Sequence, residues 1–279
     1  METRTARNGE VEIAYEVFGD AGRPLLLAGG LDAQMIWWAD GFCDGLVRGG
    51  FQVVRFDYRD AGLSTHFTGR KQAYTRDDML DDMNAVLDAI GWDSAHILGL
   101  SMGAGLAQFA ALRSPQRYRT LTLVNGLPMD DAGFGMFRHI RFPGPFRGAL
   151  RRYGTSRDEQ IRMLMNVMRL TEGRFHAFDE TWLRETAERC LDRRTPDPLA
   201  RRRQMATALR DKQKFSLAEI KHPTLVISGL ADPLVKPTAG RRLAARIPGA
   251  RLLTVPDLGH GITPHHWPLI TGELDAHAR

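Results

Sequence analysis

Ser101 lies in the segment Gly99-Leu100-Ser101-Met102-Gly103, which has the pattern G-x-S-x-G. In a chain with many glycines this pattern can arise by chance and is weak by itself, so the surrounding residues decide its meaning. An apolar run at residues 95–98 precedes it, and a run of small residues at 104–112 follows, as in a strand that turns sharply into a helix. Such a turn exposes the serine hydroxyl at a helix N-terminus, where the helix dipole favours negative charge. The pattern predicts a nucleophilic serine, against the alternative of a serine that only caps a helix.

A serine hydroxyl is a weak nucleophile at neutral pH and needs a base to remove its proton. His260 is flanked by Gly259 and Gly261 and follows the last predicted strand, residues 251–255. A histidine between two glycines in a loop has room to turn its imidazole toward the strand ends. We therefore predict that His260 is the base, whereas His96 falls inside a predicted strand and is expected to be packed in the fold.

The base in turn needs a carboxylate that fixes its tautomer and stabilises the imidazolium. Asp232 follows the predicted strand at residues 223–228 after a short Gly-Leu-Ala connection. Ser101, Asp232 and His260 occur in this chain order, each just after a predicted strand, so a parallel sheet brings all three to one edge. The alternative acid is Asp130 or Asp131, after the predicted strand that ends at residue 124.

A serine of this kind acts through an oxyanion, which needs two preorganised backbone amides. One should be the N–H of Met102, the residue after the nucleophile. The other should come from the loop Ala28-Gly29-Gly30-Leu31, with Gly30 or Leu31 as the donor. Glycine in this loop lets the backbone approach a substrate closely.

The elements that must position these residues follow from the apolar pattern. Short apolar runs alternate with helical patterns along residues 10–126, and strand character returns at 223–228 and 251–255. This alternation is typical of a mostly parallel, twisted sheet with helices on both faces. One helix is predicted between Thr75, which is a plausible N-cap with Asp78 three residues later, and Gly91 at the C-terminal end.

Residues 128–211 show helical periodicity without a convincing strand, so we predict a helical cap inserted into a core formed by residues 1–127 and 212–279. Ile161, Leu164, Met165 and Met168 form one apolar stripe at helical spacing. Methionine adapts to irregular surfaces, which favours a lid over an apolar ligand, although methionine filler in an ordinary helical core fits the pattern equally well. We predict Met165 and Met168 as substrate-binding residues on the first interpretation.

Trp37 and Trp38 follow the predicted oxyanion loop directly. One of the two tryptophans is expected to pack in the core. The other is expected to line an aromatic pocket. Because the sequence does not distinguish them, both are predicted as candidate substrate-binding residues.

The composition is that of an ordinary globular protein, with 43% hydrophobic and 25% charged residues and a formal net charge of +5. The longest basic run, Arg201-Arg202-Arg203, lacks aromatic neighbours, so we interpret it as a solvated helix face and expect no nucleic-acid partner. The N-terminal residues are polar, and no apolar stretch approaches the length of a membrane span. Together with two widely separated cysteines, Cys43 and Cys190, this favours a soluble cytoplasmic protein with buried or half-buried reduced thiols.

These motifs together resemble the α/β-hydrolase superfamily over nearly the whole chain. Residues 56–64 (FDYRDAGLS) resemble its loop of type D-x-R-x-x-G-x-S. The oxyanion loop, residues 56–64 and residues 99–105 (GLSMGAG) are similar to the aclacinomycin methylesterase group of bacterial esterases, which act on polyketide intermediates. The chain departs from the common pattern at Ala28-Gly29, where histidine-glycine is usual, and this weakens any transfer of a substrate from enzymes with the usual loop.

The resemblance implies an α/β-hydrolase fold with a helical cap, and hydrolysis of a carboxylic ester through an acyl-enzyme without a metal or an organic cofactor. The implied partner is a small, mainly apolar ester, such as the methyl ester of a bulky or polyketide-like molecule, and the oligomeric state stays open. Other classes use the same three residues, namely C–C hydrolases, cofactor-free haloperoxidases, and acyl transferases or lactone-forming enzymes. A ligand-binding protein or cyclase that leaves the serine unused is the non-hydrolytic alternative.

Overall fold

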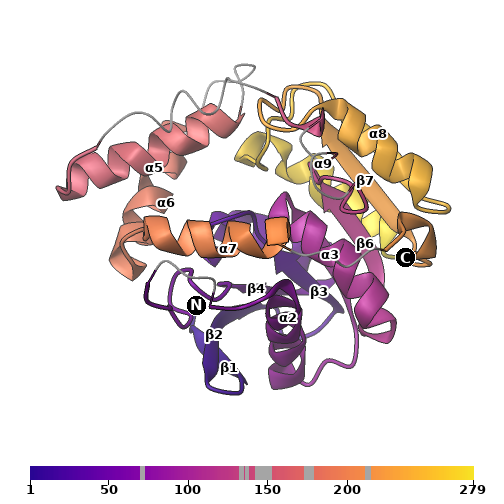
Figure 1. Cartoon of the computed structure of the whole chain (residues 1–279), viewed down its shortest axis with the longest axis horizontal. Helices are drawn as coiled ribbons and strands as arrows, with labels where there is room; N and C mark the ends of the chain where they lie inside the picture. Colours follow the sequence, from indigo (N-terminus) through magenta and orange to yellow (C-terminus); the bar gives the residue numbers. More distant parts are fainter. Residues whose placement is uncertain (70–72, 132–134, 136–137, 142–152, 173–178, 211–214) are drawn as a thin grey trace.

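The computed structural model of the chain describes residues 1–69, 73–131, 135, 138–141, 153–172, 179–210 and 215–279. Its centre is an eight-stranded sheet with the strand order β1-β2-β4-β3-β5-β6-β7-β8 (Figure 1). The strands β1 and β2 are antiparallel to their neighbours, and all other pairs are parallel. The strands are β1 (Arg4–Asn8), β2 (Val11–Phe18), β3 (Arg23–Ala28), β4 (Phe51–Phe56), β5 (Ala95–Leu100), β6 (Tyr118–Val124), β7 (Thr224–Gly229) and β8 (Arg251–Val255).

Helices cover both faces of this sheet, as the continuous apolar runs predict for strands buried on both sides. In β3, Leu25 and Leu27 belong to one buried cluster, and Leu26 and Ala28 belong to the other. The first cluster also contains side chains of α1 (Asp40–Arg48) and α9 (Trp267–His277). The second contains side chains of α2 (Arg76–Ile90), α3 (Met102–Arg113) and α8 (Pro237–Arg246). The fold class expected from the sequence is confirmed.

The predicted boundaries of α2 are also confirmed. Thr75 and Asp78 form a capping box, and Gly91 ends the helix with a left-handed φ of 78°. The strand β1 was not expected from the sequence, because only Ala6 of its five residues is buried and the others are polar. An edge strand of this kind has no apolar face long enough to produce a recognisable alternation.

Among the described residues between β6 and β7, three α-helices are present, namely α5 (Arg157–Glu172), α6 (Glu180–Arg193) and α7 (Pro198–Arg210). In Figure 1, α5 and α6 lie at the left and α7 runs from beside α6 toward the centre of the view; we call these three the cap helices. The predicted boundaries of the insertion, 128 and 211, stay predictions, and residues 142–152, 173–178 and 211–214 lie outside the described residues. At its start, Asp130 and Asp131 form ion pairs with arginines of α8, so these first residues are attached to the sheet region.

The loop that resembles D-x-R-x-x-G-x-S, residues 57–64, joins the cap helices to the sheet region. Asp57 accepts a hydrogen bond from the Met35 N–H at 2.7 Å and forms an ion pair with Arg193 of α6. Asp60 receives two hydrogen bonds from Arg203 of α7, at 2.7 and 2.9 Å. The loop therefore supplies two buried carboxylates to which the cap helices are anchored.

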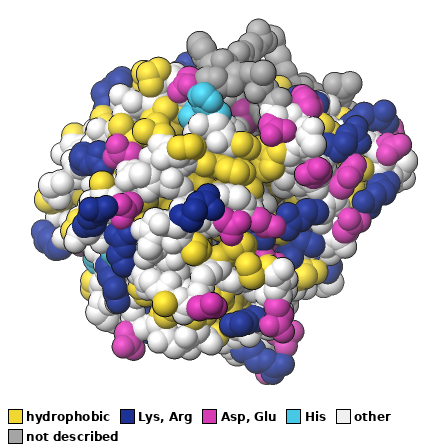
Figure 2. All heavy atoms as spheres, turned by 180° about the vertical axis from the view of Figure 1, so that it is seen from behind, with side chains coloured by type: hydrophobic (Ala, Val, Ile, Leu, Met, Phe, Trp, Pro, Cys, Tyr) yellow, Lys and Arg dark blue, Asp and Glu magenta, His cyan; other side chains and the backbone are white. Residues whose placement is uncertain are grey.

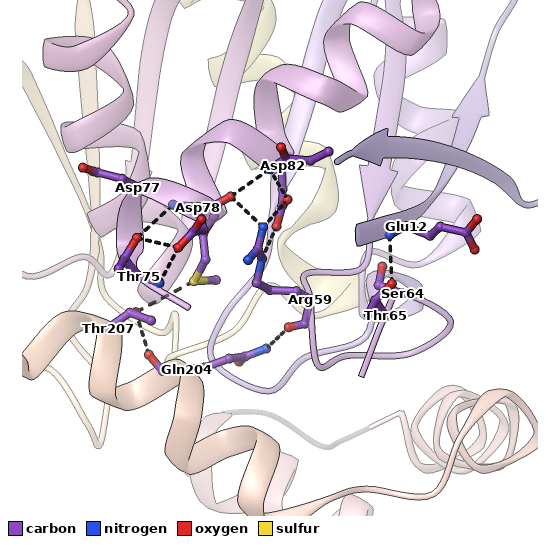
Figure 3. A network of polar contacts seen from close by, with 12 residues as sticks. Glu12, Arg59, Ser64, Thr65, Thr75, Asp77, Asp78, Asp82, Gln204 and Thr207 are labelled. Carbon is purple, nitrogen blue, oxygen red and sulfur yellow. Dashed lines mark hydrogen bonds and ion pairs between the residues drawn. The ribbon is translucent and has the colours of Figure 1, made fainter. Parts of the chain in front are cut away.

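The middle of the same loop is held from both directions (Figure 3). Arg59 makes two hydrogen bonds of 2.6 Å to Asp82 of α2, and the Gln204 amide of α7 donates to the Arg59 carbonyl at 3.0 Å. Gln204 also accepts from the Asp32 N–H at 2.8 Å, next to the predicted oxyanion loop. The Gln204 side chain of α7 thus connects the cap helices with two loops at the edge of the sheet.

This arrangement corrects the interpretation of the run Arg201-Arg202-Arg203. Arg201 and Arg202 are exposed, as a solvated helix face requires. Arg203 is buried and paired with Asp60 and Asp197, so the interpretation is wrong for that residue. The local sequence does not show the difference, because Asp60, which makes two hydrogen bonds to Arg203, lies 143 positions earlier in the chain.

Removing this anchor should have a measurable effect on stability. Arg203→Met is expected to lower the free energy of unfolding by about 3 kcal/mol, because it leaves the Asp60 carboxylate buried without its cation. Asp60 has a φ of 67°, which asparagine tolerates, so Arg203→Met/Asp60→Asn is a suitable double variant. Denaturant unfolding should show that the double variant loses less free energy of unfolding than the sum of the losses in Arg203→Met and Asp60→Asn. Simple additivity would contradict an energetic coupling between the two side chains.

The surface adds two observations. On the face in Figure 2, basic and acidic side chains are interspersed around a band of hydrophobic side chains. Over the residues described, none of the helices has both the length and the apolar character that crossing a membrane requires.

Candidate active site

Ser101 lies at the turn between β5, which ends at Leu100, and α3, which begins at Met102. Its backbone has φ 54° and ψ −112°, a conformation that non-glycine residues rarely adopt and that typically costs about 1–3 kcal/mol. The Ser101 N–H donates to the Val124 carbonyl at 3.0 Å, which holds the turn against the end of β6. A strained serine at the end of a parallel strand is the local geometry that the G-x-S-x-G pattern predicts.

Glycine is required beside Ser101 because the backbones approach closely there. A Cβ on Gly103 would lie 2.0 Å from the Ala28 carbonyl oxygen, and a Cβ on Gly99 would lie 2.4 Å from the Gly103 carbonyl oxygen. The Gly103 N–H donates to the Gly29 carbonyl at 3.0 Å. The serine turn and the loop after β3 are therefore packed directly on each other.

This packing brings the predicted oxyanion residues near the serine. A Cβ on Gly30 would lie 3.8 Å from Ser101 Cβ. Met102 is the first residue of α3, so its N–H has no acceptor within the helix. Leu31, the alternative donor, follows Gly30 and is partly exposed. The surroundings thus provide backbone amides from two elements beside one hydroxyl.

Asp232 and His260 form a hydrogen-bonded pair. His260 Nδ1 lies 2.7 Å from Asp232 Oδ2, and the other oxygen of Asp232 accepts from the N–H groups of Leu234 and Val235 at 2.7 and 2.9 Å. The Asp232 side chain is 1% exposed and that of His260 is 12% exposed. A carboxylate fixed in this way selects the tautomer with the proton on Nδ1, which leaves Nε2 as the basic nitrogen.

The charge of Asp232 also governs the protonation of the imidazole. Burial disfavours the charged form of His260, but the charge and the hydrogen bond of Asp232 raise the pKa of the imidazole above its ordinary value, and Glu172 adds to this effect. The site therefore favours an imidazolium that is formed transiently beside a carboxylate.

Asn125 connects the three loops and was not identified from the sequence. Its side-chain amide donates to the carbonyls of Gly259 and His260 at 2.8 and 3.0 Å, and its oxygen accepts from the Gly229 N–H at 2.8 Å. Within the described residues, no hydrogen bond joins Ser101 and His260 directly. The two are linked through neighbouring residues, because the Ser101 N–H donates to the Val124 carbonyl and Asn125, the next residue, donates to the His260 carbonyl. The available signal in the sequence was a polar residue directly after the apolar run of β6. In the structure this residue has a φ of 48°, which asparagine tolerates well.

The alternative acids are engaged elsewhere. Asp131 pairs with Arg242 of α8 and with His139, and Asp130 pairs with Arg246. His96 is buried in β5 with its Nδ1 2.9 Å from Thr120 Oγ1, and burial lowers its pKa to about 4. Neither set of residues contacts the Asp232–His260 pair in the described structure.

The two tryptophans differ in their surroundings. Trp38 is 5% exposed and stacks on Phe42 in the core, with ring centroids 5.8 Å apart. Trp37 is partly exposed, meets Trp182 of α6 edge-to-face at 6.2 Å, and lines a small cavity together with Asp32 and Leu164. Trp37 is therefore the tryptophan that lies between the predicted oxyanion loop and the cap helices.

The methionine stripe of α5 packs inside the cap. Met165 is buried with Ile161, Leu183 and Ala187, and Met168 is partly buried against the same cluster. These contacts fit the alternative interpretation, in which methionine fills a helical core. A role of Met165 or Met168 in substrate binding stays a prediction.

Other residues with reactive or metal-binding groups lie outside this arrangement. Burial raises the pKa of the thiols of Cys43 and Cys190 to about 12, so both are held as neutral thiols. Asp257, His265 and His266 have donor atoms within 4.8 Å of one another, close enough to share a metal ion. They also form histidine–carboxylate contacts of 3.3 and 3.5 Å, which account for their proximity without an ion.

The described geometry combines a strained serine, a histidine fixed by a carboxylate, and a glycine loop packed beside the serine. This combination is suited to nucleophilic attack on a carbonyl carbon with general-base assistance.

Comparison with known proteins identifies the family of the chain. A sequence family described as alpha/beta hydrolase fold matches residues 24–264. Over the full length, the chain is 30% identical to rhodomycin D methylesterase DauP of Streptomyces sp. (strain C5), covering 99% of that protein, and 31% identical to rhodomycin D methylesterase DnrP of Streptomyces peucetius, also covering 99%. The solved structure of a meta-cleavage product hydrolase from Pseudomonas fluorescens IP01 superposes with a TM-score of 0.74 over 98% of this chain and 96% of that chain, at 20% identity. The likeness to that structure concerns the fold alone.

Proposed function

The chain belongs to the α/β-hydrolase fold family, and from this premise we propose that it is a serine esterase in which Ser101 is the nucleophile. The observation that carries the proposal is the hydrogen bond between Asp232, after β7, and His260, after β8. The strained turn at Ser101 follows β5 of the same parallel sheet. The full-length similarity to two methylesterases supports an ester as the substrate.

In the proposed reaction, Ser101 Oγ attacks the ester carbonyl carbon while its proton moves to His260 Nε2. The carbonyl oxygen becomes an oxyanion held by the Met102 N–H and by an amide of Gly30 or Leu31. The C–O bond breaks, the leaving alcohol takes the proton from His260, and an acyl-serine remains. Water then adds to the acyl carbon with His260 as the base, which releases the carboxylic acid and restores Ser101.

The proposed substrate is a methyl ester of a bulky, mainly apolar molecule. Trp37 and Trp182 supply edge-to-face aromatic surface between the oxyanion loop and α6, and Trp267 continues it at 6.4 Å from Trp182. Aromatic side chains of this kind suit flat, apolar ligands. The full-length similarity to two proteins named rhodomycin D methylesterase supports a methyl ester as the substrate.

The test is covalent labelling of the purified protein by a fluorophosphonate probe, followed by turnover of a panel of methyl esters graded by size and aromaticity. Labelling at Ser101, a burst of alcohol release that precedes steady turnover, and preference for bulky aromatic esters are the expected results. A folded protein that is not labelled, or one that turns over only C–C substrates, would contradict the proposal. A preference for short charged esters would contradict the substrate class alone.

A further inference from the structure

Glu172 is the last residue of α5, and its environment is unusual for a carboxylate. It is 7% exposed, and neither of its oxygens makes a well-aligned hydrogen bond to a described residue. It continues the stripe of Ile161, Met165 and Met168 at helical spacing, so it occupies a position where the pattern predicts an apolar side chain. Among the described residues, no arginine or lysine forms an ion pair with Glu172, and a buried carboxylate in such surroundings is costly, which points to a role beyond packing.

The end of α5 is docked on the loop that carries His260. The His260 N–H donates to the Thr171 carbonyl at 2.7 Å. A Cβ on Gly259 would lie 2.0 Å from the Glu172 carbonyl oxygen, and a Cβ on Gly261 would lie 2.0 Å from Glu172 Oε1. The two glycines that flank His260 therefore make room for the backbone and the carboxylate of Glu172.

The charged groups that act on Glu172 are those of the candidate active site. Burial raises the pKa of Glu172 to about 7, the Asp232 charge adds to this, and His260 and the Gly261 amide oppose it. His260 faces it from the loop after β8, and Asp232 lies beyond on the loop after β7. Two carboxylates from separate elements, one of them in the cap, thus act on one imidazole.

We infer that Glu172 is a positioning residue for His260, a carboxylate that the cap supplies to stabilise the imidazolium formed when Ser101 loses its proton. The inference rests on the proposed function. The proton of Ser101 Oγ moves to His260 Nε2 and later to the leaving alcohol, while the Nδ1 proton stays with Asp232. Glu172 exchanges no proton during this cycle and acts through its negative charge, which it carries above its pKa of about 7.

Glu172→Gln tests this role because it keeps the shape of the side chain and removes the charge. The measurement is the second-order rate of labelling by a small fluorophosphonate probe between about pH 5 and about pH 9, where histidine titrates. Loss of a nearby negative charge lowers the pKa of His260, so the acidic midpoint of the rate profile should fall by about 0.5–1 unit. Glu185→Gln, which changes an exposed carboxylate of α6, is the matched control and should keep the wild-type midpoint.

Glu172→Asp keeps the charge but withdraws it by one methylene, so its midpoint should lie between those of the wild type and Glu172→Gln. It also provides the measurement if Glu172→Gln does not fold. A rate that falls equally at every pH, with the midpoint unmoved in both variants, would overturn the inference and indicate a packing role. A folded wild-type protein without any labelling would overturn the proposed function as well, so the two failures are distinguishable.

Discussion

Ser101→Ala is expected to reduce kcat/KM for ester hydrolysis by at least about 10⁴-fold and to abolish fluorophosphonate labelling. Without the hydroxyl no acyl-serine forms, and what remains is the contribution of the oxyanion amides and of substrate binding. Alanine meets the same backbone requirement at φ 54° as serine does, so the fold should be retained. Steady-state kinetics and gel fluorescence of the labelled protein measure the two effects.

Ser114→Ala is the matched control, because Ser114 is the residue that follows the opposite end of α3. It should retain labelling and turnover. Unchanged hydrolysis in Ser101→Ala would exclude this serine as the nucleophile and would favour a protein that leaves the serine unused.

Asp232→Asn is expected to lower kcat by about 10³–10⁴-fold with little change in overall shape. An asparagine that keeps the two backbone hydrogen bonds from Leu234 and Val235 uses its oxygen for them and turns its amide toward His260. The amide is a donor, so it favours the tautomer with the proton on Nε2, where the base must be free. The measurement is kcat for the best ester of the panel, with thermal unfolding to check the fold.

The pH profile of the same variant gives a second readout. Asp232 raises the pKa of His260, and the active form has a neutral imidazole, so activity is present above that pKa and is lost as the pH falls through it. In Asp232→Asn the acidic limb should move to lower pH while the plateau falls. Asp131→Asn, at the alternative acid paired with Arg242 and His139, should leave the position of this limb unchanged. A large loss in Asp131→Asn together with full activity of Asp232→Asn would contradict the proposed assignment.

The order of the core strands along the chain and the positions of Ser101, Asp232 and His260 at strand ends were predictable from the sequence. The strands β3, β5 and β7 are apolar runs followed by glycine or another turn residue, and a parallel sheet gathers such ends at one edge. Each prediction therefore depended on local sequence and on one rule of topology.

Glu172 and Arg203 could not be interpreted in the same way, because their roles depend on partners far along the chain. Glu172 belongs to an apolar stripe and meets a loop 88 positions later, around His260. Arg203 belongs to a basic run and meets Asp60 on a loop that resembles a family motif. The charge of Glu172 interrupts an apolar pattern, which was the available signal, whereas the charge of Arg203 only continues a basic run; in neither residue does the pattern identify the partner.

The anchoring of α6 and α7 on the loop of residues 57–64 has a consequence for recombination between relatives. A crossover that brings in foreign cap helices but keeps this loop would leave Asp57 and Asp60 buried without Arg193 and Arg203. The segments that must be exchanged together are therefore separated in the sequence, since the loop of residues 57–64 has to come from the same parent as helices more than a hundred residues later. A chimera that is meant to change substrate preference by exchanging the cap helices should therefore take both the loop of residues 57–64 and the cap helices from the same parent.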